Sequence, residues 1–192
     1  MHNKITTRTS TAVTTGDSSS LSQSFQHCTP SLMGHDAFVG RFADIYEHSP
    51  WVAEQSWNQG LGSEHDQIEG LHQLMAGVLN SSSRQQQLEL INAHPDLAGK
   101  AAISGQLTEA STSEQSGAGI QACSAAEFAR FTELNAAYKA KFGFVFIKAV
   151  KGSNRLQILA AFEERIHNSP AEEFERALQE IDKIALFRLQ AI

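Results

Sequence analysis

Apolar side chains recur every three or four positions along most of the chain after residue 35, which is the spacing of amphipathic helices. The expected helices cover residues 35–47, a short segment carrying Trp51 and Trp57, and residues 64–80, 84–92, 109–121, 125–142, 153–167 and 170–190. Only residues 144–147 form an apolar run that favours extended backbone. The pattern therefore predicts an all-α, single-domain bundle of seven or eight helices.

Polar, proline and glycine residues mark several ends of these helices. Thr108 is a favourable N-cap for residues 109–121, and Ser169 followed by Pro170 begins the last helix. Gly143 ends the helix over residues 125–142. His94 directly precedes Pro95, so the helix over residues 84–92 ends there, because a residue before proline avoids helical backbone.

The first part of the chain has a different composition from the rest. Residues 1–30 are dominated by Ser and Thr, a composition that buries too little apolar surface to offset the entropy of ordering. We expect a disordered tail over residues 1–30 and one helical domain over residues 31–192.

Charge and motif content exclude several classes of function. The net charge is −6 without a dense Lys/Arg run, which disfavours nucleic acid and anionic membranes as partners. Two cysteines, Cys28 and Cys123, and widely spaced histidines predict no metal site, and no nucleotide-binding glycine motif occurs. We expect a cytoplasmic protein, or a peroxisomal one in a eukaryote, although the C-terminus has no Ser-Lys-Leu address.

The segment INAHPDLAGK, residues 91–100, contains the first candidate for chemistry. His94 lies at a helix boundary, where its side chain can project into a cavity, and Asp96 follows near a new turn. Taken alone, this fragment favours a solvated or hydrogen-bonded loop histidine.

The segment LTEASTSEQSGAGI, residues 107–120, places three polar groups on one helix face. If Thr108 is the cap, Ser111, Glu114 and Gln115 share that face and form a polar floor for a ligand. The alternative is structural, because Ser111 and Glu114 also have the spacing of a capping box.

Two further polar residues interrupt apolar stripes. Asn135 lies among the aromatic positions of residues 125–142, so we expect it to be buried and to tether the following loop by a hydrogen bond. Arg188 continues the apolar stripe of the last helix, where a guanidinium must pair, bind an anion or extend to solvent near the helix end.

Four motifs in order resemble one known family: HPDLAGK, LTxxSxxEQxxAG, LNxxYxxKFGFxFI and KIAxxRL. Together with YEHSPWVAEQSW, they resemble 2-oxo-4-hydroxy-4-carboxy-5-ureidoimidazoline (OHCU) decarboxylase, an enzyme of urate degradation, over residues 35–190. The resemblance implies an all-helical, cofactor-free carboxy-lyase that is a homodimer and converts this small molecule to (S)-allantoin.

The resemblance also implies roles for individual residues. His94, Glu114 and Arg188 match the catalytic residues of the family, with His94 in proton transfer. The residues implied to bind substrate are Pro95, Ser111, Gln115, Phe144, Val145, Phe146 and Ile147. The chain departs from the family at Val145, where a proline is usual, and the valine restores a backbone N–H.

The reaction class is consistent with the missing cofactor motifs. In the substrate, a ring C=N next to the carboxylate-bearing carbon can accept the electron pair that loss of CO₂ leaves behind. Two other functions are compatible with the same residues: a non-catalytic helical interaction domain, and a lyase or hydrolase acting on a related ureide.

Overall fold

The structure, a computed structural model, describes residues 23–99 and 107–192. Within these ranges the chain forms eight α-helices and no β-strand, so the predicted all-α class and helix number are confirmed. The α-helices are α1 (His35–Phe42), α2 (Trp51–Asn58), α3 (Ile68–Ser81), α4 (Arg84–Ala93), α6 (Glu109–Gly117), α7 (Ala125–Phe142), α8 (Arg155–Arg165) and α9 (Pro170–Leu189). Short 3-10 helices, η1 to η4, cover Pro30–Leu32, Ala43–Ile45, Ser63–Asp66 and Ile120–Ala122. Among the described helices, none is long and apolar enough to cross a membrane.

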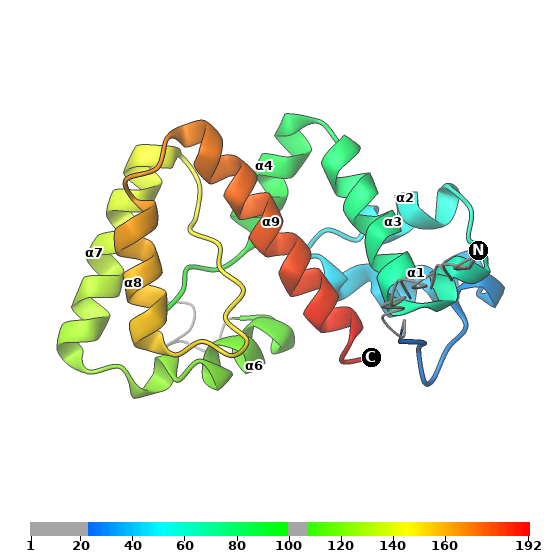
Figure 1. Cartoon of the computed structure of the whole chain (residues 1–192), viewed down its shortest axis with the longest axis horizontal. Coiled ribbons are helices and arrows are strands. Elements are labelled where there is room, and N and C mark those ends of the chain that lie inside the picture. The colour runs from blue at the N-terminus through cyan, green and yellow to red at the C-terminus, as the bar shows by residue number, and fades with distance from the viewer. Residues whose placement is uncertain (1–22, 100–106) are drawn as a thin grey trace, which may run out of the picture.

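The last helix, α9, runs between the two sides of the molecule (Figure 1). It packs against α3 and α4 on one side and against α7 on the other. Its buried face carries the apolar side chains of Phe174, Leu178, Ile181 and Ala185. Because α9 contacts both groups of helices, a residue near its C-terminal end can meet segments that are distant in sequence.

Most of the predicted helix ends are confirmed. Thr108 Oγ1 accepts a hydrogen bond from the Ser111 N–H at 3.2 Å, and Ser169 caps α9 through the Glu172 N–H. Gly143 ends α7 in the left-handed conformation, with φ of 77°. Local sequence was sufficient to predict these helix ends, because a capping residue bonds to the backbone of its own helix.

Four predicted helices are shorter than the pattern indicated. Those expected over residues 109–121 and 153–167 are Glu109–Gly117 and Arg155–Arg165, and the other two are interrupted. The helix expected over residues 35–47 ends at Phe42, and Tyr46 is extended while His48 has a positive φ of 47°. The helix expected over residues 64–80 is divided at Gln67, whose ψ is 140°. The reason is tertiary: the next amide, Ile68 N–H, donates to the Gln23 carbonyl at 2.8 Å instead of continuing a helix.

A short segment before residue 31 packs against the helical domain. Residues 23–30 have a tail-like composition, yet Phe25 is buried and its ring lies edge-on to Phe42, with centroids 5.6 Å apart. Burial of one aromatic ring and the Gln23 hydrogen bond order this short segment. Residues 1–22, the rest of the predicted tail, lie outside the described residues.

A buried ion pair joins α8 to the start of α9. Glu173 is fully buried and accepts hydrogen bonds from Arg165 Nε at 2.7 Å, Tyr138 Oη at 2.6 Å and Asn168 Nδ2 at 2.7 Å. Arg165 also donates to the Ile147 carbonyl at 2.7 Å. The pair therefore connects three helices to the extended segment 144–150.

We predict that Glu173→Ala destabilises the protein by about 3–5 kcal/mol, because it leaves the buried Arg165 charge without its partner. Glu175→Ala is the matched control, since Glu175 is exposed on the same helix, and it should stay within about 0.5 kcal/mol of the wild type. Urea unfolding followed by circular dichroism measures both values. Equal effects of the two substitutions would contradict the structural role of the pair.

Candidate functional site

A cavity of about 30 Å³ lies among α4, α6, α9 and the extended segment 144–150. Seven of the residues predicted for the site line it: His94, Pro95, Ser111, Glu114, Gln115, Phe146 and Ile147. These residues come from three separate parts of the sequence. Tertiary folding therefore brings most of the predicted site together.

His94 is buried at the C-terminal end of α4, with extended backbone (φ −73°, ψ 142°) as its position before Pro95 requires. Its Nδ1 lies 3.0 Å from the Leu90 carbonyl oxygen, which can only accept, so Nδ1 carries the hydrogen. Nε2 of the neutral ring is then a hydrogen-bond acceptor. The solvated-loop alternative for His94 is excluded by its burial.

Burial lowers the pKa of His94 to about 4, and the positive charge of Arg188 acts in the same direction. The Leu90 hydrogen bond and the negative charge of Glu47 act against this shift without cancelling it. The imidazole of the free protein is therefore neutral at pH 7 and able to accept a proton.

The polar face of α6 is formed by Ser111, Glu114 and Gln115, as predicted from Thr108 as the cap. Glu114 is not part of a capping box, because its carboxylate pairs with Arg188 at 2.9 and 3.2 Å. Gln115 lines the cavity, but its amide is bound to the backbone before α6: Oε1 accepts from the Ala98 N–H at 3.1 Å. Gln115 thus holds the loop that follows His94.

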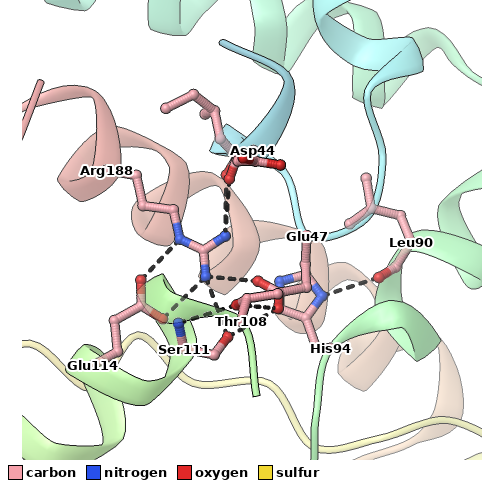
Figure 2. Close-up of polar contacts among 9 residues, drawn as sticks. Asp44, Glu47, Leu90, His94, Thr108, Ser111, Glu114 and Arg188 are labelled. Atoms are coloured by element: carbon pink, nitrogen blue, oxygen red, sulfur yellow. Dashed lines mark hydrogen bonds and ion pairs between the residues drawn. The ribbon is translucent and has the colours of Figure 1, made fainter. Parts of the chain in front are cut away.

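Arg188 is buried between two carboxylates rather than extended to solvent (Figure 2). Nε and Nη2 contact Glu114, Nη2 lies 2.8 Å from Glu47 Oε2, and Nη1 donates to the Asp44 carbonyl at 3.3 Å. Arg188 lies outside the lining of the cavity and borders a neighbouring hollow of about 340 Å³ that shares Glu114 with it. Its guanidinium therefore acts on the cavity through Glu114 and through Ser111, whose Oγ lies 3.5 Å from Nη2.

Glu47 is a site residue that the sequence pattern did not reveal. Its side chain is buried, and Oε1 accepts hydrogen bonds from Thr108 Oγ1 at 2.7 Å and Ser111 Oγ at 3.0 Å. Burial raises the pKa of Glu47, but the Thr108 hydrogen bond and the Arg188 charge outweigh it, so the net pKa is lowered. Glu47 was assigned to a continuous helix, whereas the extended Tyr46 and left-handed His48 turn the chain here. The one indication of Glu47 in the sequence was its acidic side chain two positions before Ser49-Pro50, in the motif YEHSPW.

The extended segment is held to the protein at every second residue. The Val145 N–H donates to Asn92 Oδ1 at 3.3 Å, the Ile147 carbonyl accepts from Arg165, and the Ala149 N–H donates to Glu180 at 2.9 Å. Among the described residues, no hydrogen bond uses the backbone groups of Phe146 or Lys148, which border the cavity. The N–H that valine has and proline lacks is therefore used to anchor this segment.

Three predicted contacts differ from expectation. Phe144 does not line the cavity, because its ring packs against Tyr138 and Phe174, and Val145 is buried beside it. Asn135 is buried and hydrogen-bonded as predicted, but its Nδ2 donates to the Leu97 carbonyl at 2.9 Å. It therefore tethers the loop after His94 and not the loop that follows α7, since the chain folds α7 back toward residues 95–99.

A metal centre finds no support in the described ranges, where no three His, Cys, Asp or Glu residues gather as potential ligands. The groups present at the site are one imidazole, two carboxylates, one guanidinium and backbone amides. This donor set is suited to moving protons and to orienting a polar ring.

Comparison with known proteins identifies the relatives of this chain. The sequence profile of OHCU decarboxylase matches residues 31–190. A 2-oxo-4-hydroxy-4-carboxy-5-ureidoimidazoline decarboxylase of Halalkalicoccus jeotgali is 41% identical over 82% of this chain and 85% of its own length. Two crystal structures are similar: an (S)-allantoin synthase (32% identity, TM-score 0.65, 84% of this chain and 52% of that one), and an OHCU decarboxylase in the presence of (S)-allantoin (28%, 0.61, 77% and 93%). The chain belongs to the OHCU decarboxylase family.

Proposed function

We propose that this protein decarboxylates 2-oxo-4-hydroxy-4-carboxy-5-ureidoimidazoline to (S)-allantoin in urate degradation, without a cofactor. The observation that carries the proposal is the buried, neutral His94 on a polar cavity in a chain of this family. The relatives named for the same reaction cover nearly the whole helical domain, which supports the assignment.

The chemistry requires few groups. When the C–CO₂ bond breaks, its electron pair forms a double bond to the neighbouring ring carbon, and the ring C=N nitrogen takes up a proton. The hydroxyl group then becomes a carbonyl as its proton leaves, and the ring carbon that bears the ureido group is protonated. Because a carboxylate anion leaves as neutral CO₂, the balanced reaction consumes one proton.

His94 is the group that suits these proton transfers. Its Nε2 accepts a hydrogen bond in the neutral ring, and a proton taken from the substrate hydroxyl can be returned to the ring carbon. Delivery from one side of the cavity would produce a single enantiomer. We assign His94 as the proton-transfer residue.

Glu114 and the extended segment orient the substrate in this proposal. The Glu114 carboxylate, held by Arg188, accepts hydrogen bonds from ureido or ring N–H groups. The backbone of Phe146 and neighbouring Ile147 lies along the cavity, where its N–H groups can bind carbonyl or carboxylate oxygens. Pro95, Ser111 and Gln115 complete the wall next to His94.

We also propose, on the family resemblance, that the protein is a cytoplasmic homodimer. Multi-angle light scattering after gel filtration measures the oligomeric state directly, and a mass near one chain would contradict the dimer.

We predict that His94→Asn lowers kcat for the formation of (S)-allantoin by about 10²–10⁴-fold. This is the usual contribution of a general acid–base residue. The asparagine amide can keep the hydrogen bond to Leu90 but has no group in place of Nε2. The substrate is generated in situ from urate, and circular dichroism follows the formation of one enantiomer.

His35→Asn is the matched control, because His35 is exposed and distant from the cavity lining. It should retain wild-type activity. If the wild type itself yields racemic allantoin at the spontaneous rate, the proposed reaction is wrong.

The lowered pKa of His94 also predicts a pH dependence of stability. The folded-state pKa of about 4 lies below the ordinary histidine pKa of 6.5, so the unfolded chain binds more protons between these values. This contribution is complete above about pH 6.5 and is lost as the pH falls toward 4, amounting to roughly 3 kcal/mol. Urea unfolding of wild type and His94→Asn at pH 7 and pH 4.5 tests it. Parallel losses in the two proteins would show that His94 is not buried in the neutral form.

A further inference from the structure

Glu47 has contacts that its role as a counter-ion for Arg188 does not require. Oε2 lies 2.8 Å from Arg188 Nη2, whereas Oε1 accepts hydrogens from two hydroxyl groups, those of Thr108 and Ser111. The carboxylate is 2% exposed, so bulk water does not compete for these contacts. One side chain therefore joins the chain after η2, the N-terminal turn of α6 and the end of α9 (Figure 2).

The contact with Ser111 determines what this hydroxyl group can offer to a ligand. A serine hydroxyl has one hydrogen to donate and two lone pairs that can accept. Its hydrogen is directed to Glu47 Oε1 at 3.0 Å, because an ionised carboxylate can only accept. Arg188 Nη2 approaches one of the lone pairs at 3.5 Å. Ser111 is buried on the cavity wall, so what remains for a ligand there is the other lone pair.

We propose that Glu47 is a positioning and specificity-determining residue that makes Ser111 a hydrogen-bond acceptor, so that this wall of the cavity selects a ligand N–H group. Only the identity of the ligand, a ureide with several N–H groups, rests on the proposed function. Loss of the carboxylate frees the Ser111 hydrogen, and the same hydroxyl can then turn as a donor toward the N–H group.

The other groups on this wall have the same polarity. His94 presents the lone pair of Nε2, because Nδ1 donates to Leu90, and Glu114 presents a carboxylate. Together with Ser111, they form a wall of acceptors. Phe146, Ile147 and Lys148 of the extended segment line the cavity from a different part of the chain, where backbone N–H groups can serve as donors.

The test is a double-mutant cycle on binding of (S)-allantoin, measured by isothermal titration calorimetry, which requires no turnover. Ser111→Ala removes the acceptor. Glu47→Gln changes the volume little, and its amide oxygen stays on the Arg188 donor, so an amide N–H group replaces Oε1 beside Ser111 and takes the lone pair in place of the hydrogen. Each should weaken binding roughly tenfold, the effect of about one hydrogen bond. The double variant should bind no more weakly than Ser111→Ala, because Glu47 acts through Ser111.

Asp182→Asn is the matched control. It changes another partly buried carboxyl, which lies on α9 next to Tyr46 and is absent from the cavity lining, so its affinity should equal that of the wild type. A purely structural Glu47 would weaken binding by the same factor whether or not Ser111 is present. Multiplicative effects in the double variant, or affinity within twofold of the wild type for a folded Glu47→Gln, would overturn the proposal.

Two further outcomes are decisive. If Glu47→Gln does not fold, Ser111→Ala alone tests the acceptor role, and unchanged affinity refutes it. If the wild type binds (S)-allantoin but does not decarboxylate the ureidoimidazoline, the proposed reaction fails while the role of Glu47 stands. A wild type without measurable affinity for (S)-allantoin overturns the role of Glu47 as a selector of this ligand.

Discussion

The buried guanidinium of Arg188 between Glu47 and Glu114 is the interaction on which the site depends. A charge removed from water needs partners in good geometry, and here carboxylates and carbonyls from distant segments surround it. Those partners fix where α6 stands relative to α9 and to the chain after η2. The same contacts that satisfy one buried charge therefore place the cavity wall.

The charges around the cavity also bear on its chemistry. Arg188 is offset by two carboxylates, and His94 is neutral because of its burial, so the free site carries about one net negative charge. An anionic substrate entering this environment favours protonation of His94. Since the proposed reaction consumes one proton, the substrate's own charge helps to load the residue that delivers it.

Each wall of the cavity is held in place by side-chain contacts to the rest of the protein. The extended segment is anchored through Asn92, Arg165 and Glu180, and α6 is anchored through Glu47 and Arg188. The loop after His94 is bound by Gln115 and Asn135. Each wall is thus fixed by side chains that do not themselves have to touch a ligand, which keeps the lining groups in place for chemistry.

The sequence by itself determined the helical class and most helix ends, because periodicity and caps act within a few residues of one another. It indicated His94, Ser111 and Glu114 through the family resemblance, since each of them alone also fits a structural role. It did not determine the break after Phe42 or the division at Gln67, where backbone groups bond to distant segments. Only the tertiary structure showed that Glu47 reaches the site, that Arg188 is enclosed, and that Phe144 faces the core. The apolar stripe shows that Arg188 needs a partner, but no periodicity in a single sequence identifies which distant residues pair with it. These contacts are therefore visible only in the fold.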